Sequence, residues 1–180
     1  MKQLWHRIIH YTERLRAKDG HGYARCLAQR NFFHAMGRDC YIDFSVNVDE
    51  PYLVSMGDNV WLTDDVRLLT HDGAISMLSR ATGESLRKFG SIHFGNNVFV
   101  GMNASIMPGV AVGDNCIIAT GSVVTRDVAA NTIVGGNPAK PIGKVEDYLD
   151  KWRDKQDPFS YSGSRDKEMV LVASLMGGAS

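Results

Sequence analysis

The stretch that decides the fold is residues 92–140, IHFGNNVFVGMNASIMPGVAVGDNCIIATGSVVTRDVAANTIVGGNPAK, where one chemical pattern returns at every sixth position. One row of this pattern consists of large apolar side chains: Phe94, Val100, Ile106, Val112, Ile118 and Val124. A second row follows four places after the first and consists of smaller side chains: Val98, Ala104, Val110, Cys116, Ser122 and Val128. The two rows predict that each hexapeptide points two side chains into a narrow core.

A third row, three places after the large apolar residues, contains residue types suited to corners. These types tolerate a left-handed backbone conformation: Asn97, Asn103, Gly109, Asn115, Gly121 and Asp127. The pattern predicts short strands joined by tight turns, with three hexapeptides closing one triangular coil and the coils stacking on each other. A β-sandwich is the alternative, but its strands alternate with period two and need no regular corner residue. We therefore predict an all-β solenoid, a parallel β-helix.

The solenoid is predicted to span residues 41–140 and to be interrupted once. Large apolar residues continue the register backwards, with one slip of two residues: Ile42, Val48, Met56, Leu62 and Leu68. The segment THDGAISMLSRATGESLRKFGSIH, residues 70–93, breaks the pattern. It predicts a loop ejected from the coil at about residues 70–92, and long loops on a rigid scaffold commonly carry function.

The two ends are predicted to be helical. An N-terminal cap is expected over residues 1–40. It contains one helix near the N-terminus and a second helix over residues 23–33, and these helices cover the first coil. The first of these helices is indicated by an apolar stripe: Leu4, Ile8, Tyr11 and Leu15. Val145, Tyr148, Leu149 and Trp152 predict a C-terminal helix within residues 141–180, whose tail from Pro158 has no assigned structure.

Composition favours a small-molecule ligand in a reducing compartment. Among 180 residues, Lys plus Arg and Asp plus Glu both number 20, so no net field attracts nucleic acid or anionic lipid. Cys26, Cys40 and Cys116 are scattered and odd in number, which argues against a disulfide framework and suits the cytoplasm. Charges run throughout MKQLWHRIIHYTERLR, so we expect neither a signal peptide nor membrane insertion.

The consecutive hexapeptides and the closing GNPAK resemble the hexapeptide-repeat acyltransferases, in particular the maltose, galactoside and polysaccharide O-acetyltransferase branch. The resemblance runs from about Ile42 to Lys140. It implies that the coil is left-handed, that the protein is a homotrimer and that acetyl-CoA, the acyl donor, lies in the groove between adjacent subunits. It also implies a small-molecule acceptor, a sugar or polysaccharide precursor.

The resemblance further implies that His71 is the catalytic base. The family's histidine stands where the ejected loop leaves the coil, and LLTHDGA places His71 there, in the corner row three residues after Leu68. An imidazole would remove the proton of the acceptor hydroxyl during direct attack on the thioester. The alternative is a solvated turn histidine. Asp72 or Glu84 would orient the ring, a role left open, and Phe99 stands where many relatives carry tryptophan beside the active site. These three residues are the expected substrate-binding residues.

For the donor, the resemblance carries over onto three turns and the closing motif. Backbone groups of the turns would pair with the pantetheine arm, and cationic side chains would meet the phosphates of coenzyme A. The residues are Gly101, Met102, Thr120, Gly121, Thr125, Arg126, Lys140 and Lys144.

Three other functions share features with this pattern. Amino-sugar N-acetyltransferases would use the same base and groove. The γ-type carbonic anhydrases share the coil but bind a metal through three histidines, whereas only His71 and His93 fall in the coil region, so no metal is expected. A non-catalytic scaffold is disfavoured by VVTRD and GNPAK. The acceptor, and the length of the acyl group, stay open.

Overall fold

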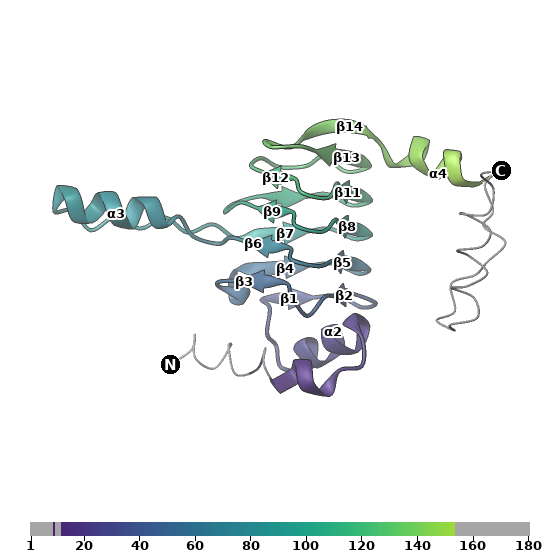
Figure 1. The fold of residues 1–180 in the computed structure, drawn as a ribbon, viewed down its shortest axis with the longest axis horizontal. Coiled ribbons are helices and arrows are strands. Elements are labelled where there is room, and N and C mark those ends of the chain that lie inside the picture. Colours follow the sequence, from purple (N-terminus) through teal and green to yellow (C-terminus); the bar gives the residue numbers. More distant parts are fainter. Residues whose placement is uncertain (1–8, 10–11, 154–180) are drawn as a thin grey trace, which may run out of the picture. The chain divides into compact units, whose positions relative to one another are not determined.

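The computed structural model describes residue 9 and residues 12–153, and most of that range winds into a three-sided parallel coil (Figure 1). From β1 to β12, consecutive strands belong to three different sheets, so the chain visits sheets A, B and C in turn. Sheet A contains β1 (Ala35–Met36), β4 (Val54–Met56), β7 (Ile92–Phe94) and β10 (Ala111–Val112). Sheet B contains β2 (Tyr41–Ile42), β5 (Val60–Leu62), β8 (Val98–Val100), β11 (Cys116–Ile118), β13 (Thr132–Gly135) and β14 (Lys140–Lys144). Sheet C contains β3 (Asn47–Val48), β6 (Arg67–Leu68), β9 (Ser105–Ile106) and β12 (Val123–Val124).

The strand register confirms the predicted repeat. Val98 of β8 pairs in parallel with Cys116 of β11, one coil of 18 residues later. Earlier coils are spaced by 20 residues, because the two-residue slip falls between β3 and β4, where the 3₁₀-helix η1 (Pro51–Leu53) lies. The spacing reaches 38 residues across the ejected loop. Only β14 breaks the pattern among the described strands, since it pairs antiparallel with β13.

The core is formed by the two predicted inward rows. Each three-residue strand of the coil has a buried first residue, a more exposed second residue and a buried third residue, as in Val98, Phe99 and Val100. The inward side chains are almost completely removed from water, among them Val60, Leu62, Val100, Ile106 and Ile118 at 0% exposure. Because each coil supplies only a thin apolar layer, stability depends on stacking one coil on the next.

The corners follow the third row with one exception. Positive φ angles occur at the predicted corner residues Asn97, Asn103, Gly109, Asn115 and Gly121. Asp127 is not among the left-handed residues; its carboxyl oxygen accepts a hydrogen bond from the Ala111 amide. The coil closes early there, because the last spacing is 16 residues rather than 18.

One corner carries a ladder of asparagine side chains. Each Nδ2 donates to the Oδ1 of the residue one coil further along, at 3.0 Å: Asn59 to Asn97, Asn97 to Asn115, and Asn115 to Asn131. All four residues have φ between 54° and 61°. The same residue type therefore satisfies both the left-handed backbone and the contact between coils.

A helix covers the first coil, as predicted, but its bounds differ. Helix α2 (Gly20–Gln29) begins at Asp19, whose side chain accepts a hydrogen bond from the Gly22 amide at 2.6 Å. Tyr23 and Leu27 are buried, and the Tyr23 ring lies 5.2 Å from that of Phe44. The coil begins at β1, before the expected boundary at residue 41.

Leu15 is the one residue of the predicted N-terminal stripe that lies among the described residues, and residues 12–16 are helical. The predicted C-terminal helix is α4 (Val145–Arg153). A second compact unit starts at Asp147, and its exposed Tyr148 and Trp152 rings lie 6.4 Å apart. The tail from Pro158 lies outside the described residues. In the described part of the chain, no helix is sufficiently long and apolar to cross a bilayer.

Candidate active site

The ejected loop leaves sheet C after β6 and returns to sheet A at β7 (Figure 1). Its outer part contains α3 (Gly73–Thr82), which ends at Gly83 with φ of 74°. Its base is a short antiparallel neck, in which the Asp72 amide donates to the Lys88 carbonyl at 3.0 Å and the Gly90 amide donates to the Thr70 carbonyl at 2.9 Å. This neck fixes His71 opposite Phe89.

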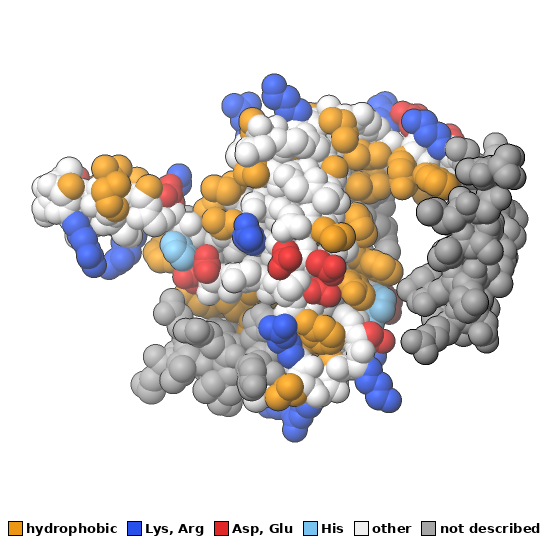
Figure 2. All heavy atoms as spheres, viewed as in Figure 1, with side chains coloured by type: hydrophobic (Ala, Val, Ile, Leu, Met, Phe, Trp, Pro, Cys, Tyr) orange, Lys and Arg blue, Asp and Glu red, His pale blue; other side chains and the backbone are white. Residues whose placement is uncertain are grey.

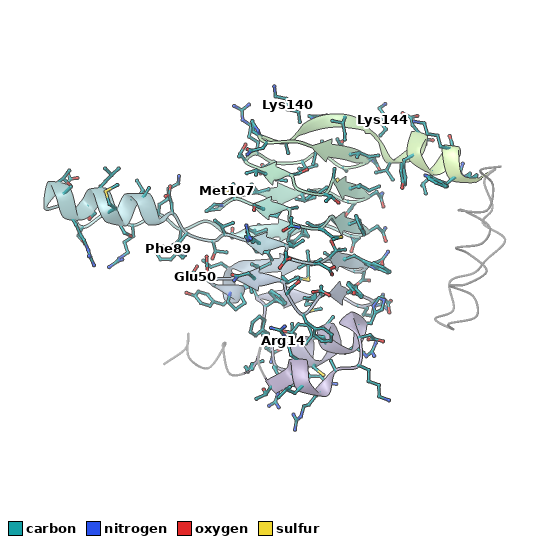
Figure 3. The ribbon with its side chains drawn as sticks, in the orientation of Figure 1. Arg14, Glu50, Phe89, Met107, Lys140 and Lys144 are labelled. Atoms are coloured by element: carbon teal, nitrogen blue, oxygen red, sulfur yellow. The ribbon has the colours of Figure 1, made fainter. Side chains whose placement is uncertain are left out.

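Glu50, from the preceding coil, lies within hydrogen-bond distance of His71. The Nδ1 atom of His71 lies 3.0 Å from Oε2 of Glu50 and 3.8 Å from Oδ2 of Asp49. The His71 side chain is 41% exposed, whereas that of Glu50 is 5% exposed. We call the ejected loop, residues 70–91, the arm. Figure 3 shows Glu50 and Phe89 where the arm leaves the coil. The imidazole therefore faces solvent while its orienting partner is buried.

Thr70 and Glu50 exchange two hydrogen bonds beneath the His71 ring. The Glu50 amide donates to Oγ1 of Thr70 at 3.1 Å, and the Thr70 hydroxyl donates to Oε2 of Glu50. Thr70 is fully buried. An ionised carboxylate can only accept hydrogen bonds, so a contact between Oε2 of ionised Glu50 and Nδ1 of His71 requires the ring proton on Nδ1. In the neutral ring Nε2 is then free to accept a proton.

The same contact makes His71 more basic. The hydrogen bond to Glu50 raises the pKa of the His71 imidazole above its ordinary value, burial lowers it, and the charges of Glu50, Asp49 and Asp72 raise it further. The ordinary value for histidine is about 6.5. The free base therefore becomes available at a higher pH than in an isolated histidine.

A cavity of about 340 Å³ opens beside His71. It is lined by residues of the coil, the neck and the arm: Glu50, His71, Asp72, Gly73, Ser76, Arg87, Lys88 and Phe89. Its volume lies at the small end of the range for ligand pockets, roughly 300–1,000 Å³. The pocket can hold a small polar molecule next to a basic imidazole.

The two acids suggested by the sequence do not contact the imidazole. Asp72 caps α3 by accepting from the Ala74 amide at 3.0 Å, and it pairs with Lys88 at 3.2 Å; hydrogen bonds from these two groups lower its pKa. Glu84 accepts from the Thr82 hydroxyl at 3.0 Å at the far end of the arm. Glu50 is the acid beside His71, and it was missed although its spacing of 20 residues from Thr70 equals one early coil.

The predicted donor-binding residues lie along two edges of sheet C. Gly101, Met102, Thr120 and Gly121 follow β8 and β11, at the edge between sheets B and C, where the Gly121 amide donates to the Met102 carbonyl at 2.8 Å. Thr125 and Arg126 follow β12, at the edge between sheets C and A, and His71 lies on this edge too.

The remaining predicted residues lie elsewhere in the coil. Lys140 and Lys144 are the two ends of β14 (Figure 3). Phe99 is 42% exposed on the outer face of sheet B, paired with Trp61 and Ile117. A single chain therefore does not bring Phe99 to the edge that carries His71.

The site also contains a group of potential metal ligands. Asp49, Glu50 and His71 each offer one ligand atom, and these atoms lie within 4.8 Å of one another. In the described part of the chain this is the one such group, and it contains a single histidine. It differs from the three-histidine set of the γ-type carbonic anhydrases.

Comparisons with known proteins agree with this architecture. Residues 91–126 match the family model described as bacterial transferase hexapeptide (six repeats). Protein CapG of Staphylococcus aureus is 39% identical over 140 residues, which cover 76% of this chain and 81% of CapG. The galactoside O-acetyltransferase of Escherichia coli K12 is 34% identical over 117 residues, which cover 62% of this chain and 54% of that protein. A galactoside acetyltransferase solved with coenzyme A superimposes with a TM-score of 0.57 at 20% identity, covering 91% of this chain and 88% of the other.

The chain belongs to the hexapeptide-repeat transferases. Its coil is the left-handed parallel β-helix of that family, which confirms the predicted fold class. The chain spans most of CapG but only about half of the galactoside enzyme.

Proposed function

We propose that the protein transfers an acetyl group from acetyl-CoA to a hydroxyl group of a sugar or polysaccharide precursor, with His71 as general base. The observation that carries the proposal is the His71–Glu50 pair, in which a buried acid holds an exposed imidazole at the mouth of a cavity. Membership of the family, and relatives named as O-acetyltransferases, support the reaction class.

The acceptor attacks the thioester directly, forming a tetrahedral intermediate that then breaks down to the products. Nε2 of His71 removes the acceptor proton as the acceptor oxygen attacks the thioester carbonyl, and the Glu50 side chain stabilises the imidazolium that forms. A backbone amide steadies the oxyanion. The carbon–sulfur bond then breaks, the new ester remains on the acceptor, and coenzyme A leaves and takes up the proton from His71. Acetyl-CoA plus alcohol thus gives acetyl ester plus coenzyme A.

The active unit in this proposal is a homotrimer. Of the predicted donor residues, Thr125 and Arg126 share the edge that carries His71. The other predicted donor residues and Phe99 lie on other faces and edges, so a second copy would supply those to each site. Exposed apolar side chains are available for such contacts on the outer face of sheet B, at Trp61 and Phe99, and on α3, at Met77 and Leu78. Acetyl-CoA would then lie between two coils, with Lys140 or Lys144 at its phosphates.

The cytoplasm is the proposed location. All three cysteines are free, and Cys40 and Cys116 are buried, which fits a reducing compartment. The balanced charge of the chain fits a small-molecule acceptor rather than nucleic acid or a membrane surface.

The test is a screen of sugars and nucleotide sugars with acetyl-CoA, followed by release of free thiol. We expect hydroxyl acceptors to release coenzyme A and His71→Ala to lower the rate of release by orders of magnitude without loss of acetyl-CoA binding. Turnover with amino sugars alone would instead assign N-acetylation. If no acetyl-CoA binds, the chain is a scaffold and the proposal is wrong.

A further inference from the structure

The wall of the cavity opposite the coil is basic, and this feature points to the class of acceptor. Arg87 and Lys88 line it from the segment that returns from α3 to β7, together with Phe89, whose ring lies 6.1 Å from that of His71. Figure 2 shows Lys and Arg side chains along the arm. Two cations therefore line one small pocket, and each needs an anionic partner from the protein or from a ligand.

Among the described residues, a carboxylate pairs with only one of these two cations. Lys88 forms an ion pair with Asp72 at 3.2 Å. The remaining acids close to His71 are Glu50, which bonds to Thr70 and to the imidazole, and Asp49, 3.8 Å from the same ring. Within the described ranges, Arg87 is the cavity cation that has no carboxylate partner. The pocket therefore presents a free guanidinium on its arm side.

The neck fixes the backbone beside Arg87 relative to His71. Lys88 and Gly90 are tied to Asp72 and Thr70 by backbone hydrogen bonds of 3.0 and 2.9 Å. Arg87 directly precedes the hydrogen-bonded residues of the neck, so its backbone stays close to His71. A planar guanidinium binds carboxylate and phosphate groups through two parallel hydrogen bonds.

We propose that the acceptor is a sugar carrying an anionic group, a carboxylate or a phosphate, which Arg87 binds while His71 deprotonates a hydroxyl group of the same sugar. This inference rests on the proposed function, since it concerns the acceptor of that reaction. Phe89, 56% exposed, supplies an apolar surface for the sugar ring between the two groups. Arg87 acts as a specificity-determining residue.

The experiment compares matched acceptors that differ only in charge. The probes are 4-nitrophenyl glucuronide against 4-nitrophenyl glucoside, the corresponding galactose pair, and glucose 6-phosphate against glucose, each with acetyl-CoA and the full chain. We expect kcat/KM for the charged member of a pair to exceed that of the neutral member by about tenfold or more, the value of a hydrogen bond to a charged group. Comparing uronides with sugar phosphates identifies which anion is bound.

The decisive variants are Arg87→Gln and Arg87→Lys, with Arg80→Gln as the matched control. Arg80 is an exposed arginine on α3 that does not line the cavity. Arg87→Gln should raise KM for the anionic acceptor by roughly 10- to 100-fold and so remove its advantage over the neutral acceptor, and Arg87→Lys should restore part of that advantage. Arg80→Gln should behave like the parent protein.

The outcomes separate this inference from the proposed function. If neutral and anionic sugars react equally well, or if Arg87→Gln keeps the parent preference, the anionic acceptor is wrong while acetyl transfer stands. If acetyl-CoA binds and no sugar of either kind releases thiol, the proposed function itself fails, and this inference fails with it.

Discussion

Replacing Glu50 by glutamine tests the contact that defines the site. The side chain keeps its size, and its oxygen can still accept from Thr70 and from Nδ1 of His71, but it no longer carries charge. The hydrogen bond to Glu50 is the largest cause that raises the pKa of His71. We therefore expect the acidic limb of the kcat/KM profile to move to lower pH in Glu50→Gln, because a less basic imidazole loses its proton earlier.

The expected loss of rate in Glu50→Gln depends on how far solvent screens the contact between Glu50 and His71. A hydrogen bond to a charged group contributes about 1.5–3 kcal/mol, or roughly 10- to 150-fold in rate. His71 is 41% exposed, so solvent screens part of this interaction and we expect the lower end of the range, about tenfold, at the pH plateau. The rate falls because the imidazolium formed during attack loses its negative partner.

The assay is thiol release across pH for the parent, Glu50→Gln and Glu84→Gln. Glu84 pairs with Thr82 at 3.0 Å on the arm, so its amide variant should keep the parent pH profile. An unchanged acidic limb and plateau in Glu50→Gln would refute the orienting role of Glu50. A shift in Glu84→Gln of the same size would show that total charge, rather than the 3.0 Å contact to His71, sets the pKa.

Three further predictions test the base and the coil. His71→Ala should lower kcat by about 10²- to 10⁴-fold with acetyl-CoA binding and oligomeric state retained, as measured by thiol release and sedimentation; near-normal turnover would remove the base. Gly113→Ala should lower the melting temperature by several degrees, because its Cβ would lie 2.7 Å from the Ala130 nitrogen, whereas Gly73→Ala, with nothing within 4 Å, should not. Asn115→Ala should have a lower melting temperature than Asn115→Gly. Both variants lose the asparagine ladder, but only alanine is strained at φ of 54°, at a cost of about 1–2 kcal/mol. The reverse order of melting temperatures would contradict the corner assignment.

The sequence by itself determined the coil. Its six-residue period fixes which side chains face inward, because each hexapeptide has one strand and one corner, and the spacing of Val98 and Cys116 by one coil follows directly. The corner row placed left-handed residues correctly where the coil is regular, as at Asn97 and Gly109. It failed at Asp127, where the shorter last coil alters the turn.

Tertiary structure decided the chemistry around His71. The exit of the loop located the histidine, but its partner came from the previous coil rather than from the nearby acids of the loop. The orienting acid is Glu50, 21 residues away in sequence, because stacking brings the ends of successive coils together at one edge. Only the folded neck shows that Asp72 is committed to Lys88 and that Arg87 is left facing the cavity. Periodicity encodes the direction of side chains within a coil, whereas pairing between polar groups depends on distances that the spacing of residues does not specify.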